Sequence, residues 1–268
     1  MRFGSFWTEA KLNAIENYLS AYTIALKKKN YKLCYIDAFA GDGSVVIKDG
    51  NEIEGSSLRA LKYPFDKFYF FEKDPYNIEK LKLKIETISQ KNIELHCGDC
   101  NDFLLQLCSL PWRKDNWRGI IFLDPYAMHL EWKSLEVISK TKVFDVWYLF
   151  PFMAVNRNFY RNGKIPIANK RRLDTILGTH NWQNEIYKDS PQLSFLDDKI
   201  CQKLDMESIK SYIIKRLKNT FPTVADNAVF FRNEKLSPMF LLCFAGSNPS
   251  KAARELSLKI ADHILSHI

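Results

Sequence analysis

Short apolar runs alternate with helix-like segments through the first 150 residues of the chain. The apolar runs, rich in β-branched and aromatic residues, are Leu33 to Phe39, Lys67 to Glu72, Ile93 to His96, Gly119 to Asp124 and Phe144 to Phe150. The helix-like segments between them are Ser56 to Leu61, Pro75 to Ile88, Asn101 to Leu107 and Glu131 to Ser139. This alternation is typical of right-handed βαβ units, and it predicts a mostly parallel sheet with helices on both faces.

The segments on either side of this pattern complete the predicted fold. Apolar positions between Thr8 and Lys29 follow one helical face, which predicts a long N-terminal helix. Beyond Pro151, basic and amide side chains become frequent, which indicates an insertion at the edge of the sheet. The C-terminal part predicts a helix, two strands that close the sheet as a hairpin, and a last helix, at Glu207 to Lys218, Ala228 to Arg232, Met239 to Ala245 and Ser250 to Ile264.

We therefore expect one Rossmann-like α/β domain over residues 1–268. Its parts are an N-terminal helix (1–30), a cofactor-binding core (31–152), a helical and basic insertion after the fifth strand (153–225), and a C-terminal strand pair with a helix (226–268). A hydrophobic content of 46% is enough to build a sizeable core in a chain of this length.

Composition and charge narrow the class of protein. No apolar run approaches the roughly 20 residues that cross a bilayer, and the first ten residues lack a signal-peptide core, so we expect a cytoplasmic protein. The net charge of +8 favours an acidic partner such as nucleic acid, although a basic surface also serves solubility alone.

Glycines and acids follow the first three predicted strands of the core. The run Tyr35 to Gly43 reads Tyr-Ile-Asp-Ala-Phe-Ala-Gly-Asp-Gly, a buried strand that ends in a tight glycine turn. The second strand ends at Glu72, where an acid can accept hydrogen bonds from the ribose hydroxyls of an adenosine ligand. The third leads into Gly98-Asp99-Cys100, which places another acid near the expected adenine position. The alternative is that these acids are only helix caps and turn formers.

A dinucleotide dehydrogenase fits this pattern less well. The third glycine of the Gly-x-Gly-x-x-Gly motif is absent, and Glu72 lies farther along the chain than the acid of that motif should. The additional length is the segment Ser44 to Gly55, which we interpret as a hairpin that turns at Asp49-Gly50.

The fourth strand stops at Asp124-Pro125-Tyr126, which is a candidate site for a planar amine. The carboxylate can accept one N–H, backbone carbonyls near the proline can accept another, and the aromatic ring can stack on a base. In isolation the tripeptide is better explained as a strand stop that opens a turn. Its position after the glycine turn and the acids favours the functional interpretation, and His129 is a further candidate to approach the substrate.

Metal chemistry is not expected. Cys97, Cys100 and His96 have no second ligand pair at zinc spacing, so packing is the better explanation for both cysteines. The scattered histidines lie beside no nucleophile, which argues against a hydrolase.

Taken together, these motifs resemble the three-Cys-motif partner family, whose members are described as S-adenosylmethionine-dependent methyltransferases. The matching stretches, which are spread along nearly the whole chain, are Trp7 to Leu12, Tyr35 to Gly41, Gly55 to Leu58, Phe71 to Asp74, Gly98 to Cys100, Phe122 to Tyr126, Leu149 to Pro151, Trp182 and Phe240 to Asn248. The strand ends are more distantly similar to ribosomal-RNA guanine N2- and adenine N6-methyltransferases. Those enzymes carry a second proline after the acid, where this chain has Tyr126.

The resemblance implies a class I methyltransferase fold, S-adenosylmethionine as cofactor and a cysteine-motif protein partner. It assigns cofactor contacts to Asp37, Phe39, Ala40, Gly41, Gly43, Glu72, Lys73, Asp99 and Cys100, and the catalytic and acceptor site to Asp124, Pro125 and Tyr126. The basic insertion is expected to contact the phosphates of a nucleic-acid substrate through Arg157, Arg161, Arg171 and Arg172. Two alternatives stay open: a catalytically silent binding module on the same fold, and a methyltransferase for a protein or a small molecule.

Overall fold

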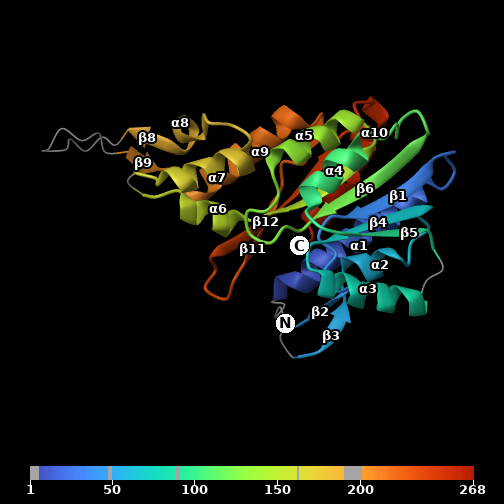
Figure 1. The fold of residues 1–268 in the computed structure, drawn as a ribbon. Helices are drawn as coiled ribbons and strands as arrows, with labels where there is room; N and C mark the ends of the chain where they lie inside the picture. The colour runs from blue at the N-terminus through green and yellow to red at the C-terminus, as the bar shows by residue number, and fades with distance from the viewer. Residues whose placement is uncertain (1–5, 48–49, 89–90, 162, 190–200) are drawn as a thin grey trace, which may run out of the picture.

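The computed structural model describes residues 6–47, 50–88, 91–161, 163–189 and 201–268 (Figure 1). Its central feature is an eight-stranded sheet in the order β10-β12-β7-β6-β1-β4-β5, with β11 paired to β12. The strands are β1 (Lys32–Asp37), β4 (Lys67–Glu72), β5 (Ile93–Cys97), β6 (Trp117–Leu123), β7 (Phe144–Phe150), β10 (Thr223–Val224), β11 (Val229–Arg232) and β12 (Pro238–Gly246). The five core strands are parallel, and β12 runs antiparallel to β7.

Helices cover both faces of this sheet, which confirms the predicted Rossmann-like fold class. One face is covered by α4 (Cys100–Cys108), α5 (Trp132–Thr141), α6 (Phe152–Asn158), α7 (Ile167–Leu177), α8 (Trp182–Ile186) and α9 (Met206–Thr220). The other is covered by α1 (Phe6–Leu26), α2 (Ser56–Ala60), α3 (Pro75–Ile88) and α10 (Lys251–Leu265).

Successive side chains of a strand point to opposite faces of the sheet, so the position of a residue along its strand decides which helices its side chain contacts. Cys34 and Ile36 of β1 pack in the core under α4 and α5, whereas Tyr35 packs on the opposite side with α2. In β6, Phe122 also packs on this opposite side. Asp37 and Asp124 continue the alternation two residues after Tyr35 and Phe122, so both carboxylates point toward the face that α1 and α2 cover.

The elements outside the main sheet agree in part with the sequence prediction. Strands β2 (Ser44–Val46) and β3 (Glu52–Glu54) form the expected hairpin, and Gly50 in its turn has φ of +85°; Asp49 lies outside the described residues. The predicted insertion, residues 153–225, contains α6 to α9, a small antiparallel sheet of β8 (Tyr187–Asp189) and β9 (Cys201–Lys203), and β10, which joins the main sheet. Strand β10 was not predicted, because two residues are too short to show a periodicity.

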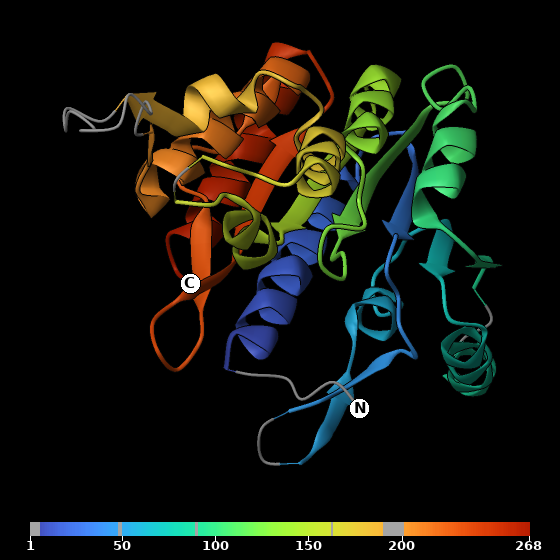
Figure 2. The same ribbon diagram turned by 60° about the vertical axis from the view of Figure 1, so that its left-hand side comes forward.

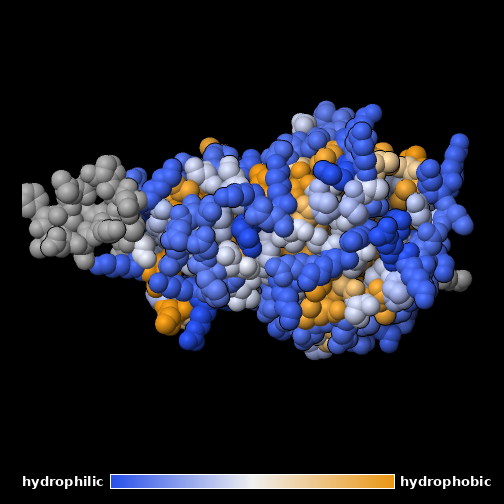
Figure 3. All heavy atoms as spheres, turned by 90° about the horizontal axis from the view of Figure 1, so that it is seen from above, coloured by the Kyte–Doolittle hydropathy of each residue, from blue (hydrophilic) through white to orange (hydrophobic). Residues whose placement is uncertain are grey.

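The two hairpins project to the same side of the molecule, where the parallel strands end (Figure 2). The N-terminal end of α1 lies between the β2–β3 hairpin and the β11–β12 hairpin in both ribbon views. Seen from above, hydrophilic residues cover most of the surface, with hydrophobic patches between them (Figure 3). Within the described ranges, no helix combines the length and the apolar character needed to cross a membrane.

A buried hydrogen bond fastens α1 to the sheet. The Tyr18 hydroxyl donates to Oδ2 of Asp145 over 2.8 Å, and Tyr18 also packs against Trp147 and Phe244. Burial raises the pKa of Asp145 to about 7, although the hydrogen bond from Tyr18 opposes this shift. The folded chain therefore holds a proton at Asp145 more tightly than the unfolded chain does.

We predict that this carboxyl group makes the protein less stable as pH rises. A raised pKa gives a stabilising contribution that is complete below the ordinary value of 3.8 and is lost as pH rises through about 7. Asp145→Asn should therefore lose less of its free energy of unfolding than the wild type between about pH 5 and about pH 8. Urea denaturation at both pH values measures this difference, with the exposed Asp115→Asn as control. Identical pH dependence in Asp145→Asn and wild type would contradict the prediction.

Candidate functional site

Four acidic side chains meet at the edge where β1, β4, β5 and β6 end. Asp37 ends β1, Glu72 ends β4, Asp99 follows β5, and Asp124 follows β6. Because these strands are parallel and adjacent, their carboxyl ends open toward one crevice, where open α/β sheets bind ligands. The structure therefore brings the four predicted acidic residues to one edge of the sheet, and their roles in binding stay a prediction.

Asp37 lies beneath the site and shapes it. Its side chain is fully buried, with Oδ1 accepting from the Phe39 backbone N–H over 3.2 Å and Oδ2 accepting from the Ser56 hydroxyl over 2.5 Å. Burial raises the pKa of Asp37 to about 7 against the lowering effect of these hydrogen bonds, and the charge of Asp124 raises it further. These contacts join the end of β1 to the glycine turn and to the start of α2.

The glycine turn is held by Glu72. Oε2 of Glu72 accepts from the Gly41 backbone N–H over 2.9 Å, and Oε1 accepts from the Asp74 backbone N–H over 2.9 Å. A carboxylate has about four lone-pair sites, so two of them remain for the hydroxyl groups of a ligand. The Ala40 backbone N–H donates to the Phe71 carbonyl, and the half-buried Phe39 packs against the core.

Both glycines of the turn adopt left-handed backbone conformations, but they face different surroundings. Gly41 has φ of +62°, and a Cβ built on it would meet nothing within 4 Å. Gly43 has φ of +82°, and its Cβ would lie 2.8 Å from Cδ1 of Leu81. Open space over Gly41 allows a ligand to approach the backbone closely, whereas Gly43 packs closely against the side chains of Leu81 and Leu58.

Asp99 caps α4 and links the third strand to the fourth. Oδ1 of Asp99 accepts from the backbone and side-chain N–H groups of Asn101, each over 2.9 Å, and Lys73 lies 3.4 Å from Oδ2. Burial would raise the pKa of Asp99, but these hydrogen bonds and the Lys73 charge lower it below its ordinary value. Burial raises the pKa of the Cys100 thiol to about 12, so Cys100 is a packing residue at neutral pH.

Asn101 extends this link to the segment after β6. Its side chain donates to the His129 carbonyl over 2.9 Å and accepts from the Glu131 backbone N–H and the Ser134 hydroxyl. A buried amide that uses every donor and acceptor fixes the relative position of two loops. Asn101 therefore joins Asp99 at the end of β5 to the segment that follows β6.

The carboxylate of Asp124 forms an ion pair with a lysine from α1. Nζ of Lys11 lies 2.5 Å from Oδ2 of Asp124, and the two side chains are 7% and 25% exposed. The ammonium group also lies 5.7 Å from the ring centroid of Trp7 and 5.9 Å from that of Phe122. One oxygen of the predicted acceptor-site carboxylate is thus already engaged by the N-terminal helix.

The two residues after Asp124 differ in burial. Pro125 is buried, whereas the ring of Tyr126 is 62% exposed and lies 5.6 Å from the His129 ring, edge to face. Ala127 has φ of +51°, a strained conformation for a residue with a Cβ. The loop thus presents an aromatic face at the edge that carries Asp124.

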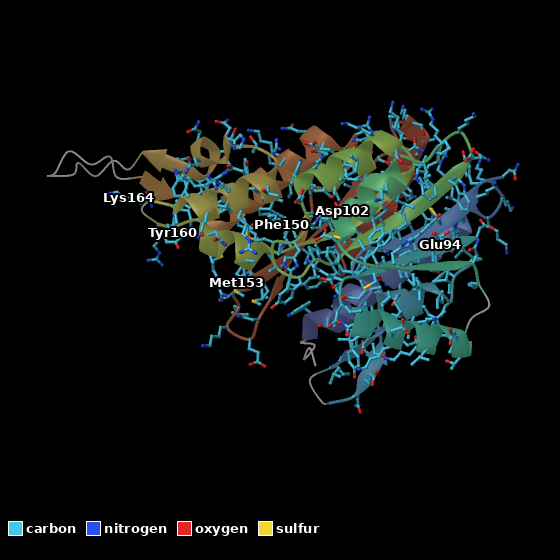
Figure 4. All side chains as sticks on the ribbon, in the orientation of Figure 1. Glu94, Asp102, Phe150, Met153, Tyr160 and Lys164 are labelled. Atoms are coloured by element: carbon cyan, nitrogen blue, oxygen red, sulfur yellow. The ribbon has the colours of Figure 1, made fainter. Side chains whose placement is uncertain are left out.

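The four predicted substrate-binding arginines are all exposed on the insertion, but they lie on separate elements. Arg157 lies on α6 and Arg161 follows it, whereas Arg171 and Arg172 lie on α7. Figure 4 shows Tyr160 and Lys164 on this part of the molecule, to the left of Phe150 at the end of β7. Their contact with a substrate stays a prediction.

Sequence reasoning missed Lys11, Ser56 and Asn101 as site residues. Lys11 lies 113 residues before its partner Asp124, and Ser56 lies 19 residues after its partner Asp37. The only indication was that Lys11 lies within the conspicuous stretch Trp7 to Leu12, and Ser56 within Gly55 to Leu58. Among the described residues, no group of three or more His, Cys, Asp or Glu side chains could hold a metal ion.

Comparisons with known proteins show the fold. Protein LPL1258 from Legionella pneumophila has a similar structure, with a TM-score of 0.50 at 14% identity over 95% of this chain and 92% of that one. The two chains share a fold. Such low identity shows nothing about a shared ligand or reaction. No family model matches the sequence, and no curated protein matches it.

Weaker likenesses include two methyltransferases. Human methyltransferase-like protein 13 in complex with SAH gives a TM-score of 0.44 at 11% identity, over 97% of this chain and 92% of that one. Trm1 from Pyrococcus horikoshii with S-adenosyl-L-methionine gives 0.39 at 12% identity, over 90% and 65%. These scores are too low to carry an argument, so the resemblance to the three-Cys-motif partner family stays a prediction.

We predict that substitution by alanine destabilises the protein less at Gly41 than at Gly43. Gly41→Ala should cost about 1 kcal/mol from the left-handed conformation alone. Gly43→Ala should cost about 1–3 kcal/mol more, because its Cβ overlaps Leu81. Urea denaturation of both variants measures the difference, and equal destabilisation would contradict it.

Proposed function

We propose that the chain is an S-adenosylmethionine-dependent methyltransferase that acts on an exocyclic amine of a nucleic-acid base. The observation that carries the proposal is the meeting of the open Gly41 turn, Glu72, Asp99 and Asp124 at one sheet edge. A hydrogen bond joins Gly41 to Glu72, and Asn101 joins Asp99 to the His129 carbonyl. This combination fits an adenosine-containing ligand on the β1, β4 and β5 side and an acceptor amine beside β6.

The residues suit the cofactor in their donor and acceptor chemistry. Gly41 leaves room for the ligand at the backbone, and Glu72 keeps lone pairs for the ribose hydroxyls. Asp99 has a lowered pKa and stays ionised, so it can accept from an amino group. When bound, the cofactor supplies an electrophilic methyl group.

Asp124 and Tyr126 would place the acceptor. With Oδ2 held by Lys11, the other carboxylate oxygen of Asp124 can accept one N–H of the amine and orient its lone pair. The exposed ring of Tyr126 can stack on the base, a contact worth about 1–3 kcal/mol in single-strand binders. Lys11 acts through Asp124 and is a positioning residue in this scheme.

We predict that Asp124→Asn lowers methyl transfer by roughly 100-fold, because the amine loses its oriented acceptor. Lys11→Met should lower it by roughly tenfold or more, and the double variant should be no slower than Asp124→Asn, since the two residues act as a unit. Lys27→Met, which changes an exposed lysine after the end of α1, is the matched control.

The measurement is transfer of a radiolabelled methyl group from S-adenosylmethionine to total RNA and to genomic DNA, with S-adenosylhomocysteine binding as the check that each variant is folded. Asp124→Asn with undiminished transfer would contradict the assigned role. Binding of the cofactor without transfer to either nucleic acid would favour a protein or small-molecule acceptor. Neither binding nor transfer would favour a catalytically silent module, with or without a cysteine-motif protein partner.

A further inference from the structure

The tip of the β11–β12 hairpin presents an apolar side chain to solvent. Leu236 is 74% exposed, and its φ is +57°. A left-handed backbone is unfavourable for a residue with a Cβ, and an exposed leucine gains nothing from burial. Such an arrangement persists only where the surrounding structure determines it.

Hydrogen bonds within the turn determine this conformation. The Leu236 backbone N–H donates to the Asn233 carbonyl over 2.9 Å, and the Arg232 guanidinium donates to the Leu236 carbonyl over 2.9 Å. Oδ1 of Asn233 accepts from the backbone N–H groups of Lys235 and Ser237, each over 3.0 Å. The turn is therefore a rigid support that points one apolar side chain outward.

The hairpin overhangs the edge that carries Asp124. Leu241 of β12 pairs with Phe150, the last residue of β7, so the hairpin continues beyond the end of the parallel strands. Leu123 of β6 pairs with Tyr148 of β7, which pairs with Cys243 of β12, so these three residues form one row across the sheet. Leu236 precedes Cys243 by seven positions. At about 3.3 Å per residue, the tip extends on the order of 20 Å beyond this row, which is less than one turn of a nucleic-acid duplex.

The base of the hairpin is fixed relative to the candidate site by aromatic contacts. The Trp7 ring lies 6.1 Å from Phe231 and 4.8 Å from Phe240. One helical turn later, Lys11 lies over the Trp7 ring and pairs with Asp124. The distance between the tip and the acceptor carboxylate is thus set by packed contacts rather than by a loose linker.

Two exposed cations of the hairpin, Arg232 and Lys235, favour a polyanionic partner, and Lys210 of α9 lies beside them and pairs with Glu207 over 3.7 Å. Arg232 and Lys210 lie 5.2 and 5.4 Å from the ring centroid of Phe230, and Lys235 is exposed in the turn beside Glu234. Phe230 also contacts Phe152 at the start of α6, the helix that carries Arg157. Met153 of α6 lies beside the hairpin in Figure 4.

We propose that the β11–β12 hairpin docks on base-paired nucleic acid and that Leu236 inserts between stacked bases. Apolar side chains on rigid elements act as such wedges, and unstacking helps an enzyme to extrude a base from a duplex. Cations around the hairpin would contact the phosphates on either side. The inference rests on the proposed function for the fate of the extruded base, but the wedge itself can be tested without methyl transfer.

The test uses the full chain and an RNA stem-loop with 2-aminopurine in its stem, alongside a DNA duplex and a single strand of the same sequence. Wild-type protein should bind the paired probes and raise the 2-aminopurine fluorescence, which reports unstacking. Leu236→Asn should lower this rise by about fivefold while affinity changes much less, because asparagine keeps the left-handed turn but cannot act as an apolar wedge. The control is Leu256→Asn, which changes an exposed leucine on α10.

Equal fluorescence changes in Leu236→Asn and wild type would overturn the proposal, as would binding to the single strand alone or to no probe. A preference between the RNA and DNA duplexes identifies the kind of duplex that the hairpin recognises. Unstacking without methyl transfer would support the wedge and count against the proposed function. If the rate of methyl transfer to a duplex is the same in Leu236→Asn and wild type, this result would support the proposed function and count against the wedge.

Discussion

The ion pair between Lys11 and Asp124 is the contact on which the arrangement of the candidate site depends. It joins the N-terminal helix to the end of β6 across 113 residues of sequence, and it is nearly shielded from water on the lysine side. Removing one partner of such a pair leaves a charge without compensation, at a cost on the order of 3–5 kcal/mol when burial is complete. Since Asp124 is partly exposed, its free oxygen can still face a ligand.

The ion pair divides the sheet edge into two parts with different chemistry. On one side, Glu72 and Asp99 hold the Gly41 turn and the start of α4 through backbone N–H groups. On the other, Asp124 pairs with Lys11 of α1, Lys11 lies over the Trp7 ring, and Trp7 packs against Phe240 of the β11–β12 hairpin. Asn101 connects the two sides through buried hydrogen bonds. Under the proposed function, the first part would hold the nucleotide-like cofactor and the second part the polyanionic acceptor.

Local patterns in the sequence were sufficient for the fold and for placing the acidic residues at one edge of the sheet. Strand and helix periodicity identified the five parallel strands, and the glycine turn and Glu72 were recognised from their places at strand ends. The burial of single residues could not be predicted from these patterns. Asp37 has the sequence position of a ligand contact, but its side chain is fully buried beneath the glycine turn. The partner of Asp124 depends on how α1 crosses the sheet, which helical periodicity does not specify. The tip of the β11–β12 hairpin was missed because its conformation comes from the Asn233 side chain.

The central claim is that this sheet edge binds an adenosine-containing cofactor through Glu72. Calorimetric titration with S-adenosylhomocysteine of wild type and of Glu72→Gln tests it most directly, with Glu86→Gln on the exposed side of α3 as the control. The account predicts micromolar binding, about −8 kcal/mol, that weakens at least tenfold in Glu72→Gln and is unchanged in the control. Absence of binding to the wild type at millimolar ligand, or equal binding to Glu72→Gln, would contradict it.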